Sequence, residues 1–310
     1  MVDSRQVTRW DVSGIPDMTG NVVLITGASS GIGFGAASVL AGKGATVIVA
    51  ARNAEKAGDA RDQLVGQHPG ATVELLALDL ASLKDIRRAA AEFQSRHERL
   101  DLLINNAGVM VPPYGQTEDG FELQFGTNHL GHFALTGLLL SQLFAAPASR
   151  IVTVSSGAHR AGRMHFDDLQ SEHGYRATAA YGQSKLANLL FTYELQERLA
   201  AAGRATIAVA AHPGWARTGL QRHAADHWWW TPATWVEPMF SQSADEGALP
   251  TLRAATDPTT VGGAYYGPSG FMEGKGKPVL VDSSTRSHDI AAQHRLWAVS
   301  EELTGVKYGF

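Results

Sequence analysis

The sequence predicts an α/β protein with a doubly wound parallel sheet of six or seven strands and helices on both faces. Three observations support this prediction: short apolar runs alternate with helical patterns along the 310 residues, glycines follow the first run, and no shift in composition divides the chain. The expected strands are residues 21–26, 45–50, 72–78, 101–105, 150–155, 205–211 and 278–281. The expected helices are residues 32–41, 53–67, 83–96, 120–143, 178–201 and 245–255.

Local signals mark where these elements begin and end. Residues 21–26 are rich in β-branched side chains, as expected for a parallel strand that is buried on both faces. Gly42 and Gly44 end the first helix, because glycine readily adopts the backbone that follows a helix C-terminus. Asn53 begins a polar helix, and the hydroxyl of Ser82 caps the helix after the third strand. The later strands and helices repeat this alternation.

The composition excludes several classes of function. The chain has no cysteine, which excludes disulfides, thiolate metal sites and cysteine nucleophiles, and we expect no metal site. The net charge is -4 and no long basic run is present, which argues against nucleic acid or an anionic membrane as a partner. The N-terminus is polar, and the longest apolar stretch, 133–146, is shorter than the roughly 20 residues that span a bilayer. We therefore expect a soluble, cytoplasmic protein.

A glycine-rich turn, TGASSGIG at residues 26–33, joins the first expected strand to the first helix. Gly27, Gly31 and Gly33 allow the backbone to turn tightly and approach a pyrophosphate, while the helix N-terminus supplies free N–H groups and a positive dipole end. An ordinary glycine turn is the alternative, but the position directly after the first strand favours phosphate binding. The cofactor contacts expected here are Gly27, Ser29, Ser30, Gly31 and Ile32.

Three motifs in this order resemble the short-chain dehydrogenase/reductase family: the glycine turn, NNAG at 105–108 and YGQSK at 181–185. The match spans about residues 20–220. The resemblance implies a Rossmann-type fold, a nicotinamide cofactor and oxidoreductase activity. It also implies that Asn106, Ala107 and Gly108 line the nucleotide-ribose side of the cofactor, and that Asp79 and Leu80 hold its adenine.

The end of the second strand predicts NADP(H) rather than NAD(H) as the cofactor. An NAD site usually places a carboxylate there to bind the ribose 2′-hydroxyl. This chain has Arg52 and Asn53 at that position, and no acid. The planar guanidinium of Arg52 suits a 2′-phosphate, although a surface charge at the start of the next helix is the alternative reading. We expect Arg52 and Asn53 to contact the cofactor.

Tyr181 and Lys185 lie four residues apart on a helical pattern, so they share one face. The pKa of a free tyrosine is about 10. A nearby ammonium, together with the positive ring of an oxidised nicotinamide, favours the phenolate and lowers that pKa. We therefore expect Tyr181 to transfer the proton and Lys185 to orient the ribose, with both residues also contacting the cofactor.

The resemblance supplies the remaining site residues. Of Ser155 and Ser156, the alignment of RIVTVSS to the family pattern selects Ser156, which would hydrogen-bond the substrate oxygen. Asn128 matches the family asparagine that bends its helix and holds a water linking the lysine to solvent. The segment HPGWARTGL would shape a turn beneath the nicotinamide. The cofactor contacts expected in it are Pro213, Gly214, Trp215 and Thr218.

Two features suggest the branch and the substrate. The insert between Ser156 and Tyr181, and the sequence AYGQSKLANLLFTYEL, resemble retinol-dehydrogenase-like members and light-dependent protochlorophyllide reductases. The latter rely on cysteine, which this chain lacks, and the N-terminal membrane anchor common in animal retinol dehydrogenases is not seen. We expect a single dinucleotide-binding domain over residues 1–310, with a small irregular lobe at about 219–245. The four tryptophans of the lobe either line a pocket for an apolar, bulky substrate or pack the lobe itself or a subunit contact.

The sequence thus predicts an oxidoreductase that transfers a hydride between NADP(H) and a small-molecule carbonyl or alcohol. Related enzymes are often dimers or tetramers formed through the two long helices, which leaves a homo-oligomer open. Two alternatives remain. A catalytically weak, NADP-binding regulatory protein is disfavoured by the intact catalytic residues. A nucleotide-sugar epimerase or dehydratase would usually be longer at the C-terminus and have a different glycine spacing.

Overall fold

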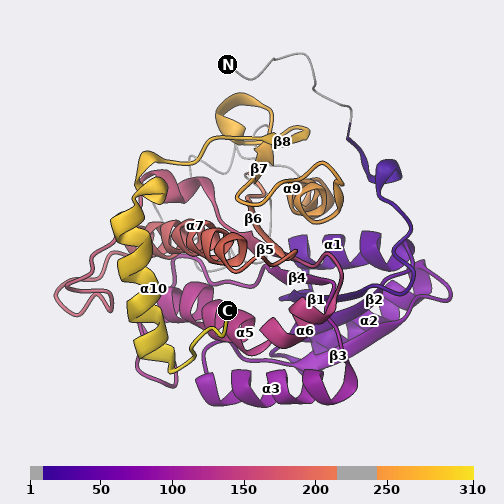
Figure 1. The fold of residues 1–310 in the computed structure, drawn as a ribbon, viewed down its shortest axis with the longest axis horizontal. Coiled ribbons are helices and arrows are strands. Elements are labelled where there is room, and N and C mark those ends of the chain that lie inside the picture. The colour runs from indigo at the N-terminus through magenta and orange to yellow at the C-terminus, as the bar shows by residue number, and fades with distance from the viewer. Residues whose placement is uncertain (1–9, 215–242) are drawn as a thin grey trace.

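The computed structural model describes residues 10–214 and 243–310. Within these residues, eight strands form one sheet in the order β3-β2-β1-β4-β5-β6-β7-β8 (Figure 1). All neighbours are parallel except β7 and β8, which are antiparallel. The strands are β1 Val22–Thr26, β2 Thr46–Ala51, β3 Val73–Ala77, β4 Leu102–Asn105, β5 Arg150–Val154, β6 Ile207–Ala211, β7 Tyr265–Pro268 and β8 Pro278–Leu280.

The doubly wound α/β class is confirmed, with two differences in detail. The strand β7 was not expected, and β8 runs against its neighbour, so the sheet has one more strand than predicted and an antiparallel edge. β1 lies between β2 and β4, with Ile25 level with Val49 on one side and Ile104 on the other. The carboxyl ends of these three strands therefore reach the same edge of the sheet.

Helices cover both faces of the sheet. The helices are α1 Gly31–Gly42, α2 Ala54–Gln67, α3 Leu83–Arg96, α4 Leu123–Phe125, α5 Gly131–Leu138, α6 Leu140–Ala145, α7 Ala177–Ala201, α9 Ala244–Thr256 and α10 Ile290–Thr304. Shorter turns are η1 Val12–Gly14, η2 Gly126–Leu130, η3 Gly157–Arg160, η7 Phe271–Glu273 and η8 Thr285–His288.

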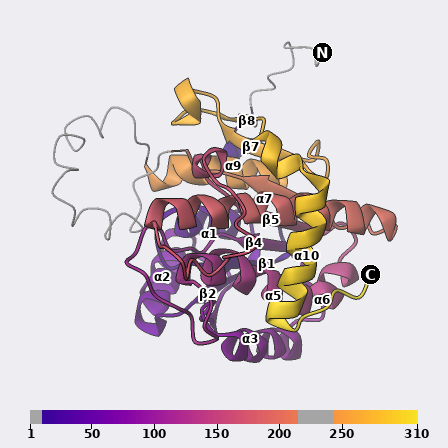
Figure 2. The same ribbon diagram turned by 90° about the vertical axis from the view of Figure 1, so that its left-hand side faces the viewer.

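Successive side chains of a strand point to opposite faces, so each strand contributes to two cores. On β1, Val23 and Ile25 belong to the core shared with α1, α2 and α9. Leu24 belongs to the opposite core, shared with α3, α5 and α7. The helix α10 packs outside α7 and α5, as Figure 2 shows. It was not expected from the sequence, although Asp289 caps its first turn and Gly305, at φ 63°, ends it.

The long helix expected at 120–143 is divided into α4, η2, α5 and α6. The turn η2 is a wider, π-type turn, a feature often found at functional sites. Gly131 follows it at a close contact, since a Cβ atom there would lie 2.5 Å from the carbonyl oxygen of Leu80. This contact sets the helix against the loop that follows β3.

Most of the predicted lobe at about 219–245 lies outside the described residues, as do the predicted contacts Trp215 and Thr218. The last part of the lobe is helical rather than irregular, because Ser243 and Glu246 form a capping box at the start of α9. Among the helices of residues 10–214 and 243–310, none combines the length and the apolar character needed to cross a membrane.

Candidate active site

A cavity of about 520 Å³ opens at the carboxyl ends of the central strands. It lies where the strand order reverses between β1 and β4, the position at which doubly wound sheets bind ligands. The predicted residues that line it are Gly27, Ser29, Ser30, Gly31, Ile32, Arg52, Asn53, Asp79, Leu80, Asn106, Ala107, Gly108, Tyr181, Lys185 and Pro213. The structure therefore brings together residues that are almost 190 positions apart in the sequence.

The glycine turn has the backbone that the sequence predicts. Gly27 and Gly31 have φ values of 69° and 58°, in the left-handed region that favours glycine. A Cβ atom on Gly33 would lie 2.5 Å from Nδ2 of Asn106 and 2.6 Å from the carbonyl oxygen of Gly27. The side chain of Ser30, at the N-cap of α1, makes no capping hydrogen bond. Because the first amides of a helix have no partner within it, α1 presents N–H groups to an anion in the cavity.

The NNAG turn is fixed to the end of β1 by Thr26, which the sequence reasoning missed. The hydroxyl of Thr26 accepts hydrogen bonds from the amides of Asn106 and Ala107, both at 2.9 Å. Nδ2 of Asn106 donates to the carbonyl oxygen of Thr26 at 2.9 Å. A Cβ atom on Gly108 would lie 3.0 Å from Oδ1 of Asn128 and 3.6 Å from Nζ of Lys185, so a side chain there would press on the amide of Asn128.

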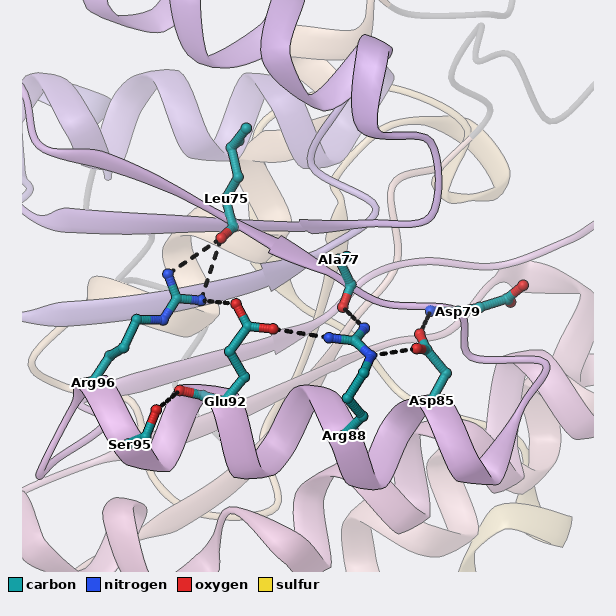
Figure 3. Close-up of polar contacts among 8 residues, drawn as sticks. All are labelled: Leu75, Ala77, Asp79, Asp85, Arg88, Glu92, Ser95 and Arg96. Atoms are coloured by element: carbon teal, nitrogen blue, oxygen red, sulfur yellow. Dashed lines mark hydrogen bonds and ion pairs between the residues drawn. The ribbon is translucent and has the colours of Figure 1, made fainter.

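Polar contacts hold the loop after β3, where Asp79 and Leu80 line the cavity (Figure 3). The amide of Asp79 donates to Oδ2 of Asp85 at 2.7 Å, and Arg88 joins Asp85 to the carbonyl oxygen of Ala77. These contacts attach the end of β3 to the first turns of α3. They fix the backbone of Asp79, while its Oδ1 accepts from the amide of Ala81 at 2.9 Å.

Two cationic side chains, Arg52 and Lys56, also line the cavity. Among the described residues, Arg52 pairs loosely with Asp79, with Nη1 3.8 Å from Oδ2, and 75% of its side chain is exposed. Lys56 was missed, although it lies four residues after Arg52 on a helix whose N-cap, Asn53, accepts from the Lys56 amide at 2.8 Å. A cation one helical turn after a predicted phosphate ligand was the signal that could have found it.

Tyr181 and Lys185 lie one turn apart on α7, as predicted. Nζ of Lys185 is 5.7 Å from the centre of the Tyr181 ring and donates to the carbonyl oxygen of Val154 at 3.1 Å. Ser156 lies close enough to Tyr181 to lower the pKa of its phenol. Ser155 points elsewhere, since its hydroxyl donates to the carbonyl oxygen of Lys185 at 2.8 Å. Of the two serines, Ser156 is therefore the one beside the phenol.

Burial sets the charges of this pair. It raises the pKa of Tyr181 to about 12, against the opposite effect of Ser156. It lowers the pKa of Lys185 to about 8. The expectation that the lysine and an oxidised nicotinamide together lower the pKa of Tyr181 stays a prediction for the protein with its cofactor. In the protein by itself, loss of hydration disfavours the phenolate. At neutral pH the phenol carries its proton.

Asn128 lies in the wider turn η2 and is fully buried. Its Oδ1 accepts from the amide of Val109 at 2.7 Å, and its Nδ2 donates to the carbonyl oxygen of Val109 at 2.9 Å and to the hydroxyl of Ser184 at 3.0 Å. The side chain therefore joins the NNAG loop to the catalytic helix, beside Lys185.

Comparisons with known proteins agree with this geometry. The family model of the short chain dehydrogenases matches residues 21–228. Retinol dehydrogenase 13 of Homo sapiens is 43% identical over 294 residues, which cover 93% of this chain and 86% of that protein. Retinol dehydrogenase 11 of Homo sapiens is 41% identical over 306 residues, which cover 97% of this chain and 92% of that protein.

Solved structures show the same relationship. The structure of an uncharacterized protein from Mycobacterium paratuberculosis has a TM-score of 0.81 and 42% identity, covering 97% of this chain and 99% of that one. The RhlG/NADP active-site complex of Pseudomonas aeruginosa has a TM-score of 0.64 and 26% identity, covering 80% of this chain and 94% of that one. With the glycine turn and the Tyr181–Lys185 pair in one cavity, these matches show that the chain is an oxidoreductase of the short-chain dehydrogenase family, in its retinol-dehydrogenase-like branch.

Proposed function

We propose that the chain transfers a hydride between NADP(H) and the carbonyl or alcohol group of an apolar, bulky substrate. The observation that carries this proposal is the position of Tyr181 and Lys185 in the cavity that also contains the uncapped N-terminus of α1. The free amides of α1 suit a pyrophosphate, and the same cavity holds a protonated phenol beside an ammonium. The whole chain would act as one dinucleotide-binding domain.

The residues of the cavity fit a dinucleotide. Gly27, Gly31 and Gly33 would let the pyrophosphate approach the first amides of α1, where the helix dipole favours negative charge. Asn106 and Pro213 would hold the ribose and nicotinamide, and Asp79 and Leu80 the adenine; all four residues line the cavity. Bound there, the cofactor supplies or accepts the hydride at C4 of its nicotinamide ring.

Arg52 and Lys56 support NADP(H) over NAD(H). Both line the adenine end, and the loose contact of Arg52 with Asp79 leaves its guanidinium able to form paired hydrogen bonds with a 2′-phosphate. The RhlG relative, named for its complex with NADP, is consistent with this choice. Asp79 itself would stay on the adenine side, because its amide is held by Asp85.

The catalytic steps follow from the charges of the side chains. Ser156 would donate a hydrogen bond to the substrate oxygen and orient it toward Tyr181. Because the pKa of Tyr181 is about 12, the phenol keeps its proton at neutral pH and can give it to a carbonyl oxygen during reduction. The Lys185 ammonium would stabilise the phenolate that remains, and Asn128 would hold the lysine side of the site in place.

The apolar part of the lining supports the class of substrate. Met110, Pro112 and Leu123 line the cavity beyond the NNAG loop. Pockets of mainly hydrophobic lining with a few placed polar groups favour apolar ligands. The names of the retinol dehydrogenases to which the chain is similar favour an apolar alcohol or aldehyde. A preference for small polar carbonyls over long aliphatic or polyene aldehydes, measured as kcat/KM with NADPH, would contradict this part of the proposal.

The variant Tyr181→Phe tests the chemistry. General acid catalysis typically contributes about 10²- to 10⁴-fold, so we expect turnover to fall by at least that lower factor while NADPH still binds. Fluorescence titration with NADPH gives the binding control. A rate near that of the unchanged protein would overturn the scheme and revive the catalytically weak NADP-binding alternative.

The cytoplasmic location stays a prediction.

A further inference from the structure

The loop between β7 and β8 has a conformation that its own sequence does not explain. It is closed by backbone hydrogen bonds from Ser269 to Lys277, at 2.8 Å, and from Gly270 to Lys275, at 2.9 Å. At its tip, Met272 and Glu273 have φ values of 50° and 55°. Two successive residues with side chains rarely adopt this left-handed backbone, and they keep it only where surrounding contacts hold them.

The Glu273 carboxylate makes those contacts. Its Oε1 is 2.7 Å from Nη2 of Arg160, and its Oε2 is 3.0 Å from Nε2 of His212. His212 is buried, with 2% of its side chain exposed, and its Nδ1 accepts from the amide of Gly214 at 3.3 Å. Nε2 therefore carries the proton and faces the Glu273 carboxylate at that short distance. One carboxylate thus holds residues from two separate turns.

Each of those turns contributes to the proposed site. Arg160 ends η3, the short helical turn that begins directly after Ser156. His212 directly follows β6 and precedes Pro213, which lines the cavity on its nicotinamide side. The loop also touches the second turn directly, since a Cβ atom on Gly214 would lie 2.4 Å from the carbonyl oxygen of Gly274.

A second set of contacts holds the serine turn from the same side. Nδ1 of His159 donates to the carbonyl oxygen of Ser156 at 2.6 Å, and its Nε2 accepts from the amide of Ser284 at 3.1 Å. Nη2 of Arg160 also donates to the carbonyl oxygen of Asp282 at 2.6 Å. The segment after β8 therefore fixes the serine turn, and Glu273 is the group that joins this assembly to the turn at His212.

We propose that Glu273 is a positioning residue that holds the serine turn and the Pro213–Gly214 turn at a set separation, and so determines how a substrate oxygen on Ser156 faces the nicotinamide. This inference rests on the proposed function for its effect on catalysis. An error of 1 Å in such a placement can cost about 10²-fold in rate. The hydrogen bond from His212 and the charge of Arg160 hold the pKa of Glu273 below its usual range, so the carboxylate is ionised at neutral pH.

The chain contains a matched control. Glu194, on α7, also holds one arginine and one histidine: its Oε1 is 2.7 Å from Nε of Arg198, and its Oε2 is 3.5 Å from Nε2 of His294. Its side chain is 4% exposed. Glu194 lies more than two helical turns beyond Lys185 and does not line the cavity. Removing it disrupts a similar ion cluster without touching either turn.

The experiment compares Glu273→Ala, Glu273→Gln and Glu194→Ala with the unchanged protein. We expect Glu273→Ala to lower kcat by about tenfold or more, a fraction of the effect of a full 1 Å error, while KM for NADPH changes less than about twofold. Glu273→Gln should recover part of the rate, because its amide oxygen can accept from His212. Glu194→Ala should lose stability but keep its kcat. Equal kcat values in the two alanine variants would overturn the proposal.

A second readout does not depend on turnover. Hydrogen exchange at the amides of residues 157–160 and at Gly214, measured with NADPH present, should become faster in Glu273→Ala and stay unchanged in Glu194→Ala. If the exchange responds in this way but no carbonyl is reduced by the unchanged protein, the proposed function fails and the link between the two turns stands. Unchanged exchange at both turns would overturn the positioning role whatever the activity.

Discussion

The imidazole of His132 donates a hydrogen bond from Nδ1 to the main-chain carbonyl of Asn128, at 2.9 Å. Because a carbonyl can only accept, the ring is the Nδ1–H tautomer, and its Nε2 accepts from the hydroxyl of Thr26 at 2.9 Å. The same hydroxyl accepts from the NNAG turn, so one hydrogen-bonded chain links the turn η2 to the nucleotide side of the cavity. The chain requires a neutral histidine.

Three buried histidines predict that the protein loses stability in mild acid. Burial lowers the pKa of His129 to about 3, and those of His132 and His159 to about 4, against about 6.5 in the unfolded chain. Since the folded pKa values are depressed, the full stability is present above pH 6.5 and is lost as the pH falls below it. By linkage, each histidine lowers the free energy of unfolding by about 1.4 kcal/mol when the pH falls from 7.5 to 5.5. The three together lower it by about 4 kcal/mol.

Urea unfolding at pH 7.5 and at pH 5.5 measures this difference in the free energy of unfolding. His129→Phe should reduce it by about a third, whatever its effect on stability at pH 7.5, because one titrating group is gone. The carboxylates with lowered pKa, such as Asp257, contribute only as the pH approaches their own lower range. An equal free energy of unfolding at pH 7.5 and 5.5 would show that the histidines are not buried as described.

The rate of carbonyl reduction should fall as the pH rises above about 8. Burial lowers the pKa of Lys185 to about 8, whereas that of Tyr181 is about 12, so the lysine is the group that loses its proton first. Without the ammonium, the phenolate left after proton transfer is less stable. We expect kcat/KM to fall about tenfold per pH unit on the alkaline side, with a single ionisation. A profile that stays flat to pH 10 would contradict this assignment.

Arg52→Ala should lower kcat/KM for NADPH but not for NADH. Loss of hydrogen bonds to a charged group costs about 1.5–3 kcal/mol, which corresponds to roughly 10- to 100-fold. Lys56→Ala should have a smaller effect of the same kind, because an ammonium is a single point charge. Arg61→Ala is the control, since this arginine of the same helix pairs with Asp62 at 2.7 Å and does not line the cavity. An equal loss with both cofactors would argue against the 2′-phosphate contact.

The parts of the site that could be predicted from the sequence are those written in contiguous residues. The glycine turn, the NNAG turn and the Tyr181–Lys185 spacing each need only a few neighbouring positions, and the structure gathers them in one cavity. Thr26 and His132 were not predicted as a pair, because they are 106 residues apart and neither is unusual in its own segment. Glu273 was missed for the same reason: its partners lie 61 and 113 residues away along the chain.

The elements of the fold also divide into those that the sequence predicted and those that it did not. Buried strands such as β1 are short, continuous apolar runs rich in β-branched residues, and this composition identified them. The resemblance implied a bend at Asn128, but the helical pattern alone did not show the break at η2, because the wider turn is held by contacts of Asn128 with Val109 and Ser184, which only the folded chain provides. The helix α10 could have been found, since Asp289 and Gly305 stand at its ends in the positions that helix caps favour.

Gly33→Ala should weaken cofactor binding, because the added Cβ atom would lie 2.5 Å from Nδ2 of Asn106 and 2.6 Å from the carbonyl oxygen of Gly27. Overpacking of this kind typically costs about 1–3 kcal/mol, and here it would separate the two turns that enclose the cavity. Gly58→Ala, on α2, is the matched control: its Cβ atom would meet nothing within 4 Å, and we expect a gain in stability of about 0.4–1 kcal/mol. Titration with NADPH and urea unfolding measure both effects. If the two variants bind NADPH equally well, the close approach of the glycine turn to Asn106 is not what shapes the site.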